Sequence, residues 1–202
     1  MKIMLAQAPV FAAAFAVSAC TIFPEQEAPR LMDLAPPASA PTFETTRNTS
    51  LRIDTPLASA PLDSPRILIK PDAYEFQALP DTRWRDSMPV VLRDYLVQDL
   101  RQSGAFDSVL NDTSTASAEL SLVSELTGFH AVREDGKTTV VVRLYTEMME
   151  NRSRKSWCRQ DHHVQTPAAS TDLNDLMNAF SESARQLSAD IALWAHQCRG
   201  DD

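Results

Sequence analysis

Apolar residues recur with a helical period in two separate stretches of the chain. The first begins with Asp86, Ser87 and Pro89, which suit the first turn of a helix, and ends at Gly104. Its apolar positions are Val91, Leu92, Tyr95, Leu96 and Leu100. This spacing predicts an amphipathic helix of about five turns.

The second helical stretch lies near the end of the chain and has the clearest pattern. Ser170 and Thr171 precede it as candidate caps. Its apolar residues, in steps of three and four, are Leu173, Leu176, Met177, Phe180, Ala184, Leu187, Ile191 and Trp194. A long helix with one apolar stripe must cover a sheet or a partner. Nearby strands that need a cover favour a helix inside the domain, and a coiled coil is the alternative.

Between the two helices the period becomes two, which predicts strands. Leu120, Leu122 and Leu126 fall on one face of the first strand, and Val123 and Phe129 fall on the other. Asp135-Gly136 is typical of a tight hairpin turn. The next strand alternates Val140, Val142, Leu144 and Met148 with polar residues, and a turn near Asn151 leads into Lys155 to Val164. These strands predict an antiparallel meander.

Proline dominates the region before the first helix. Eight of the 13 prolines fall between Pro24 and Pro65, so this part is expected to be extended, with short strands between the prolines. The candidate strands are residues 30–34, 51–54 and 66–70, with 74–79 as an ambiguous fourth. The strand near Arg66, the first helix and the strand near Glu119 predict a β-α-β unit whose two strands lie parallel.

The fold class that follows is α/β (α+β). We expect a mixed sheet of about five strands with one β-α-β unit, a C-terminal antiparallel meander and a long C-terminal helix. Periodicity alone leaves open whether the helices share one face. The expected organisation is a signal peptide at 1–19, an anchor and tether at 20–28, a single domain at 29–199 and a tail at 200–202.

The first 20 residues form a targeting segment. Lys2 precedes an apolar stretch that is too short to span a bilayer as a permanent helix, and Val17-Ser18-Ala19-Cys20 follows it. This ending resembles the lipobox of bacterial lipoproteins, which implies cleavage before Cys20 and acylation of its thiol. By the same resemblance Thr21, which is not an aspartate, implies export to the periplasmic face of the outer membrane. The alternative is an ordinary signal peptide with Cys20 merely nearby.

Charge and composition narrow the function further. The net charge of -8 argues against binding to the nucleic-acid backbone, and four glycines in 202 residues argue against a glycine-rich phosphate loop. An oxidising compartment would give Cys158 and Cys198 a purpose as a disulfide, because acylation removes the third cysteine, Cys20, from pairing. Two buried free thiols are the alternative.

Candidate catalytic chemistry is sparse. His162 and His163 are adjacent, so in a strand they point to opposite faces and cannot chelate one ion unless the segment leaves the sheet; His130 could approach from a neighbouring strand. Neither a nucleophile elbow nor a zinc-protease helix motif is present in the sequence. We therefore predict no catalytic residue, no metal and no cofactor. Trp84, in the loop before the first helix, and its neighbour Arg83 are the candidate partner-docking residues.

Several of these features occur together in one known family. Arg66-Ile67-Leu68-Ile69-Lys70, then Tyr74 and Arg83-Trp84, precede a helix that ends in Gly104, Phe106 and Val109. Arg30 to Pro36 looks like an opening strand behind the anchor, and Phe180 to Trp194 like a closing helix. The order of these motifs behind a lipobox resembles the ABC-type transport auxiliary lipoproteins, the group that includes the PqiC-like proteins.

This resemblance implies a noncatalytic accessory lipoprotein. Its partner would be an MCE-domain protein of an inner-membrane ABC transport system that moves lipid between membranes, and acylated Cys20 would bind outer-membrane lipid. A homo-oligomer is left open. The rival functions are an envelope-assembly or envelope-integrity lipoprotein and, from another class, a periplasmic metal-dependent hydrolase that uses His130, His162 or His163.

Overall fold

The computed structural model describes residues 27–37 and 42–199 of the chain. Its elements, in chain order, are β1 (Arg30–Met32), β2 (Arg47–Ile53), β3 (Leu57–Ala58), β4 (Leu68–Lys70), β5 (Gln77–Ala78), β6 (Thr82–Trp84), α1 (Met88–Ser103), β7 (Phe106–Asn111), β8 (Leu120–Glu134), β9 (Lys137–Glu150), β10 (Ser156–Pro167) and α2 (Leu173–Gln197). Within the described ranges, neither helix has the length and apolar character needed to cross a bilayer.

The long strand β8 organises the main sheet. Its partner on one side is β9, which in turn pairs with β10, so the three strands form an antiparallel meander. On its other side β8 pairs with three parallel strands, β2, β3 and β4, one after another along its length. β7 lies parallel to β2 at the edge of the sheet, and β5 pairs with β4. A separate two-stranded parallel sheet joins β1 to β6.

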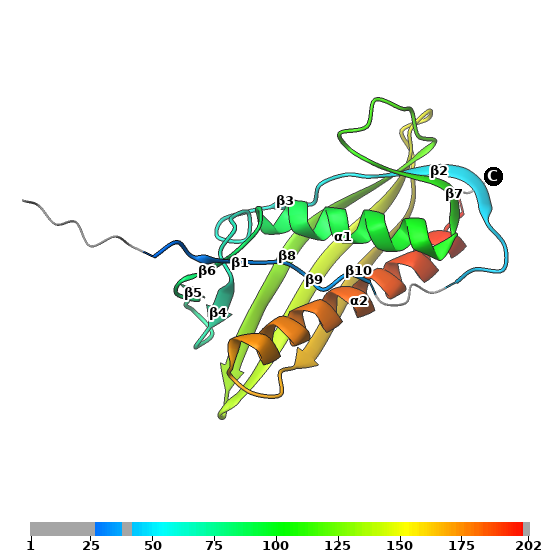
Figure 1. Ribbon diagram of the computed structural model, residues 1–202. Coiled ribbons are helices and arrows are strands. Elements are labelled where there is room, and N and C mark those ends of the chain that lie inside the picture. Colours follow the sequence, from blue (N-terminus) through cyan, green and yellow to red (C-terminus); the bar gives the residue numbers. More distant parts are fainter. Residues whose placement is uncertain (1–26, 38–41, 200–202) are drawn as a thin grey trace, which may run out of the picture.

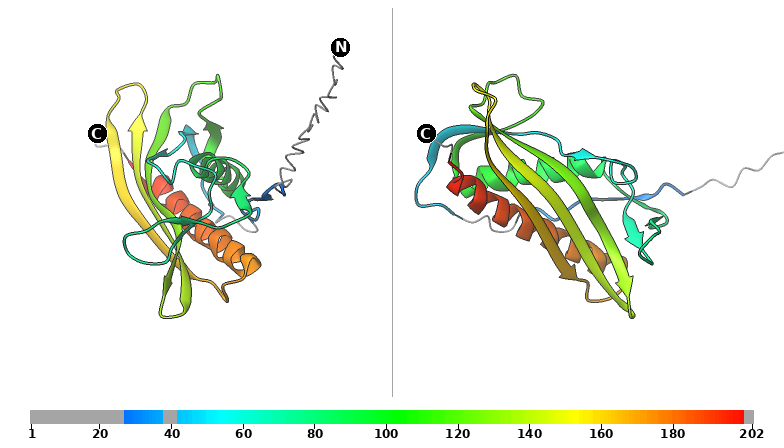
Figure 2. Two further views of the ribbon diagram at one scale, coloured as in Figure 1. Left: turned by 90° about the vertical axis from the view of Figure 1, so that its left-hand side faces the viewer. Right: turned by 180° about the vertical axis from the view of Figure 1, so that it is seen from behind.

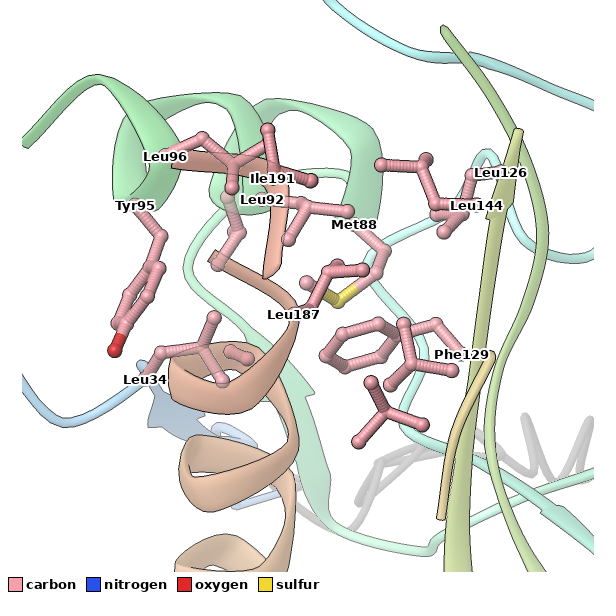
Figure 3. Packing of buried hydrophobic residues seen from close by; sticks show 14 of the residues in the cluster. Leu34, Met88, Leu92, Tyr95, Leu96, Leu126, Phe129, Leu144, Leu187 and Ile191 are labelled. Atoms are coloured by element: carbon pink, nitrogen blue, oxygen red, sulfur yellow. The ribbon is translucent and has the colours of Figure 1, made fainter. Parts of the chain in front are cut away.

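Both helices cover the same face of the main sheet, as the two views in Figure 2 show. Side chains from both helices, from β8 and β9 and from Leu34 behind β1 meet in one core (Figure 3). Between the helices, buried Asp99 of α1 accepts a hydrogen bond from the Ser188 hydroxyl of α2 at 2.5 Å. Burial raises the pKa of Asp99 although this bond and Arg185 oppose the shift. The opposite face of the meander carries exposed polar residues such as Glu125 and Arg143, as expected for an antiparallel sheet with one solvated side.

The structure confirms the predicted class and its main parts. Both predicted helices and all three strands of the meander are present, and Ile69 of β4 lies parallel to Ala131 of β8, as the β-α-β prediction required. Asp135 and Gly136 form the hairpin turn with positive φ values of 50° and 75°. Within the described residues the main sheet has eight strands rather than about five, because β3 and β7 were not predicted and β5 was only the ambiguous candidate at 74–79.

One predicted face was wrong. Phe129 was expected on the face opposite Leu126, yet both side chains are only 1% exposed and belong to the same core. The register between β8 and β9 shifts between Leu126 and Gly128, which marks a β-bulge. An extra residue in a strand inverts the alternation beyond it, so Phe129 and Ala131 continue the inward row of Leu120, Leu122 and Leu126.

Candidate anchoring and docking surface

One end of the domain receives the chain from its N-terminal segment. We call this end the tether end and define it as β1, β4, β5, β6 and the loop 71–76. Figure 1 shows these elements gathered where the described chain begins. Residues 27–29 line a shallow hollow together with residues 81–83, at the start of β6. Cys20, the predicted lipid-attachment residue, lies outside the described residues.

β1 and β6 give the tether end an inner and an outer face. The Arg30 backbone amide donates to the Asp81 carbonyl at 2.8 Å, and Leu31 lies beside Arg83 in the register of the pair. Alternate residues of a strand point to opposite sides. Leu31 and Arg83 are therefore exposed, whereas Met32 packs against the core.

The docking prediction for Trp84 was wrong. Its side chain is 1% exposed and forms edge-to-face contacts with Phe129 and Phe180, at ring-centroid distances of 5.9 and 5.4 Å. Trp84 follows exposed Arg83 in β6, so strand alternation turns it inward. Trp84 is thus a core residue under the tether end, and Arg83 alone of the predicted docking pair reaches the surface.

Arg85 fixes the tether end to α1. Its guanidinium forms ion pairs with Asp33 at 2.9 Å and with Asp94 of α1 at 2.8 Å. The hydrogen bond to Asp94 raises the pKa of Arg85 against the effect of burial. Burial raises the pKa of Asp94, but the hydrogen bonds from Arg85 and Arg93 outweigh it and leave that pKa below its ordinary value. β1 is therefore positioned by a network of ion pairs as well as by backbone bonds.

The loop 71–76 projects from the hairpin of β4 and β5. The Asp72 carboxylate accepts the backbone amides of Tyr74 at 2.8 Å and Glu75 at 3.0 Å, which is an Asx turn. Lys70 donates to the Ala73 carbonyl at 2.9 Å and lies 5.0 Å from the ring centroid of Phe76. These contacts shape the loop from within and leave the Tyr74 side chain 99% exposed.

His130 lies below this loop on the outer side of the sheet. The ring of Phe76 meets it edge-on at 5.2 Å, and the Nδ1 atom of His130 is buried with no hydrogen-bond partner among the described residues. Burial, together with the nearby charges of Lys70 and Arg143, lowers the pKa of His130 to about 4. His130 is therefore a neutral ring at neutral pH.

The other two histidines of the metal hypothesis lie apart from each other. His162 is buried on the inner face, 3.0 Å from the Thr146 hydroxyl and edge-on to Trp194, and burial lowers its pKa. His163 is exposed on the outer face beside Gln165. In the part of the chain that the structure describes, no three His, Cys, Asp or Glu residues gather closely enough to hold a metal ion.

At the opposite end of the molecule, a disulfide joins Cys158 of β10 to Cys198 at the end of α2, across 40 residues of sequence. This is the pair that the sequence favoured. Arg47 of β2 adds a second connection, because its guanidinium donates to the carbonyls of Ala195 at 2.7 Å and Cys198 at 2.8 Å. We call this region, comprising the disulfide and Arg47 with the rings of Phe106 and Trp157 beneath it, the stapled end.

Sequence reasoning missed Arg47. The residue stands in a polar run, Thr45 to Ser50, and has no periodic pattern around it that would signal a role. Its partners are backbone carbonyls nearly 150 residues away, which only the fold brings near. Arginine is well suited to cap the C-terminus of a helix, where several carbonyls lack intrahelical partners.

Comparison with known proteins bears on the whole described domain. The family model for the ABC-type transport auxiliary lipoprotein component matches residues 32–192. No curated protein matches the chain. A crystal structure of a protein from Xanthomonas campestris is similar with a TM-score of 0.74 and 18% identity, over 82% of this chain and 94% of that one. A hypothetical protein from Chlamydia trachomatis has a TM-score of 0.50 and 10% identity, over 74% and 96% of the two chains. At these identities the structural similarities show a shared fold.

Proposed function

The chain belongs to the family of ABC-type transport auxiliary lipoprotein components, and from this membership we propose that it is a noncatalytic accessory lipoprotein of an intermembrane transport system. The observation that carries the proposal is the family match over residues 32–192, which spans both helices and the sheet almost to their ends. The protein would act by binding other subunits.

The anchor of this lipoprotein would be Cys20. Each methylene of an acyl chain that enters the bilayer contributes about 0.8 kcal/mol, so several chains on one cysteine hold a domain firmly. Thr21 supports placement at the periplasmic face of the outer membrane, because the residue is not the aspartate associated with retention at the inner membrane. The disulfide at the stapled end fits an oxidising compartment of this kind.

The partner would be an MCE-domain protein of an inner-membrane ABC transport system that moves lipid between the membranes. The described domain would dock that partner through an exposed surface while Cys20 holds it at the outer membrane. Arg83 stays a docking candidate because it is exposed. Arg152, an exposed arginine in the turn between β9 and β10, is its matched control.

Mass spectrometry of the unreduced protein from fractionated membranes tests the anchor. We expect the mature chain to begin at an acylated Cys20 and to occur in the outer-membrane fraction, with Cys158 linked to Cys198. A soluble chain that carries an unmodified Cys20 would remove the anchor from the proposal.

Affinity purification from detergent-solubilised membranes tests the partner. We expect wild-type protein to recover MCE-domain and ABC-transporter subunits, and Cys20→Ala to recover far less because the chain leaves the membrane. An Arg83→Glu variant that loses these subunits, beside an Arg152→Glu variant that keeps them, would place the partner at the tether end. Wild-type protein that recovers no transporter subunit would contradict the proposed function.

A further inference from the structure

Exposed apolar side chains concentrate at the tether end. Five large hydrophobic residues are exposed in the described part of the chain, and three of them belong to this end: Leu31 at 61%, Tyr74 at 99% and Phe76 at 37%. They come from two separate strand pairs, β1–β6 and β4–β5, that Figure 1 shows side by side. Apolar groups gathered in one exposed region mark a surface that contacts something else.

The aromatic residues of this surface are presented by a structured loop. Asp72 and Lys70 fix the backbone around Tyr74 through three hydrogen bonds. Phe76 is held between Lys70 and His130, so only part of its ring reaches the surface. A loop that is shaped in advance loses little conformational entropy when it binds.

The distance to the membrane limits what this surface can meet. Arg30, the first residue of β1, is ten positions after Cys20, and a fully extended chain of that length spans at most about 35 Å. If Cys20 is acylated, the tether end therefore stays within that reach of the bilayer. β8 alone, with 15 residues, is about 50 Å long, so the stapled end can lie much farther away.

The charges around the surface are mixed. Arg30, Lys70 and Arg83 are accompanied by Asp72, Glu75 and Asp81, so the region has no strong net charge. Attraction to an anionic surface would be weak here, and the apolar side chains must supply most of the binding. Tyrosine is well suited to the zone between hydrocarbon and water, because its ring is apolar and its hydroxyl is polar.

We propose that Leu31, Tyr74 and Phe76 form a second membrane contact that lies in the headgroup region of the bilayer and sets the orientation of the domain above it. The contact rests on the proposed function, since acylated Cys20 is what brings the tether end to the membrane. It would direct the stapled end and the β9–β10 turn toward the periplasm.

The test uses the acylated protein, purified from membranes and reconstituted into phosphatidylethanolamine–phosphatidylcholine vesicles. A Tyr74→Cys variant carries an environment-sensitive NBD label on its new thiol. A Leu193→Cys variant carries the same label on α2, at a residue that is 47% exposed and outside the tether end. Flotation of the vesicles reports the anchor, and the emission of the label reports the contact.

We expect the label at position 74 to emit at shorter wavelength and to be quenched by lipids that carry a spin label, whereas the label at position 193 stays water-like. Adding anionic phosphatidylglycerol or raising the salt concentration is expected to change this little. Protein that floats while both labels stay water-like would overturn the proposal. A shift at position 74 that requires added transporter subunits would also overturn it and assign the surface to a protein partner.

A second arm separates this contact from the anchor. A mature chain with a hexahistidine tag in place of Cys20 is held on vesicles that contain a nickel-chelating lipid, and the same two labels are read. If native protein proves to lack acyl chains, the proposed anchor fails, and this arm still decides the contact. A shift at position 74 would support the contact, and water-like emission there would refute it.

Discussion

At the stapled end, β10 and the end of α2 are joined by a covalent bond, and Arg47 connects both to β2. At the tether end, no strand is longer than three residues, and short strand pairs, the buried ring of Trp84 and the ion pairs of Arg85 hold the elements together. Short strands with few neighbours open more easily than long paired ones. We therefore expect the short strands of the tether end to open more readily than the long, disulfide-linked elements of the stapled end.

Removing Trp84 should lower the stability of the tether end more than any other change, because that ring is the main core residue beneath it. We expect Trp84→Ala to lower the free energy of unfolding by about 3–5 kcal/mol, the usual cost of emptying a buried aromatic site. Urea denaturation followed by circular dichroism measures it. Trp157→Ala, at the half-buried tryptophan of the stapled end, is the control and should cost clearly less. Equal costs would show that Trp84 is not the main core residue of its end.

Opening the disulfide should lower the free energy of unfolding of the whole domain and loosen the stapled end locally. The loop between Cys158 and Cys198 closes 40 residues, and the chain-entropy estimate gives about 4 kcal/mol for the double variant Cys158→Ser, Cys198→Ser. Hydrogen exchange should speed up in the last turns of α2 and in β10, with β1 and β6 unchanged. Faster exchange spread evenly over the domain would argue against two independently held ends.

Acid should loosen the tether end through His130. Its folded-state pKa of about 4 lies below the ordinary 6.5, so the folded state disfavours the protonated ring. Stability is therefore fully present above pH 6.5 and is lost as the pH falls toward 4, by up to about 3 kcal/mol at about 1.4 kcal/mol per pKa unit.

Urea denaturation at pH 7 and pH 5 measures this loss. A His130→Leu variant should lose less stability between the two values than wild type, whereas His163→Leu, at an exposed ring, should behave as wild type. Burial also lowers the pKa of His162, so a residual pH dependence is expected in His130→Leu. An unchanged slope in that variant would remove His130 as the cause.

The smallest of these effects is expected at Arg47. Hydrogen bonds from a charged group contribute about 1.5–3 kcal/mol, so Arg47→Met, which keeps an apolar stem, should cost about 2 kcal/mol. Arg52→Met in the same strand removes a partly exposed ion pair with Asp54 and should cost less than about 1 kcal/mol. Similar values for both variants would show that the carbonyls at the end of α2 are satisfied without Arg47.

Sequence periodicity predicted the elements that are long enough to show a period. The two helices and the meander each contain several repeats of their pattern. The dipeptide Asp135-Gly136 alone was enough to predict the hairpin turn. The two- and three-residue strands β3, β5 and β6 are too short to show any period. They form because they pair with β8, β4 and β1, respectively for β3, β5 and β6. Which strands lie side by side depends on the tertiary fold and cannot be read from the local sequence.

The errors at single residues have the same origin. A bulge between Leu126 and Gly128 cannot be seen in an alternating pattern, yet it decides that Phe129 joins the core. Trp84 was placed in a loop, where a large aromatic residue suggests a contact surface. Once β6 pairs with β1, strand alternation buries it.

The successive pairing of β2, β3 and β4 along one edge of β8 also has a consequence for the order in which the chain can fold. Leu51 pairs with Leu120, and Ile69 with Ala131, so each of these segments is synthesised more than 60 residues before its partner. Contacts between distant parts of a chain require loop closure before they contribute any stability, which slows folding. The proline-rich first third therefore cannot pair with β8 until the middle of the chain has been synthesised.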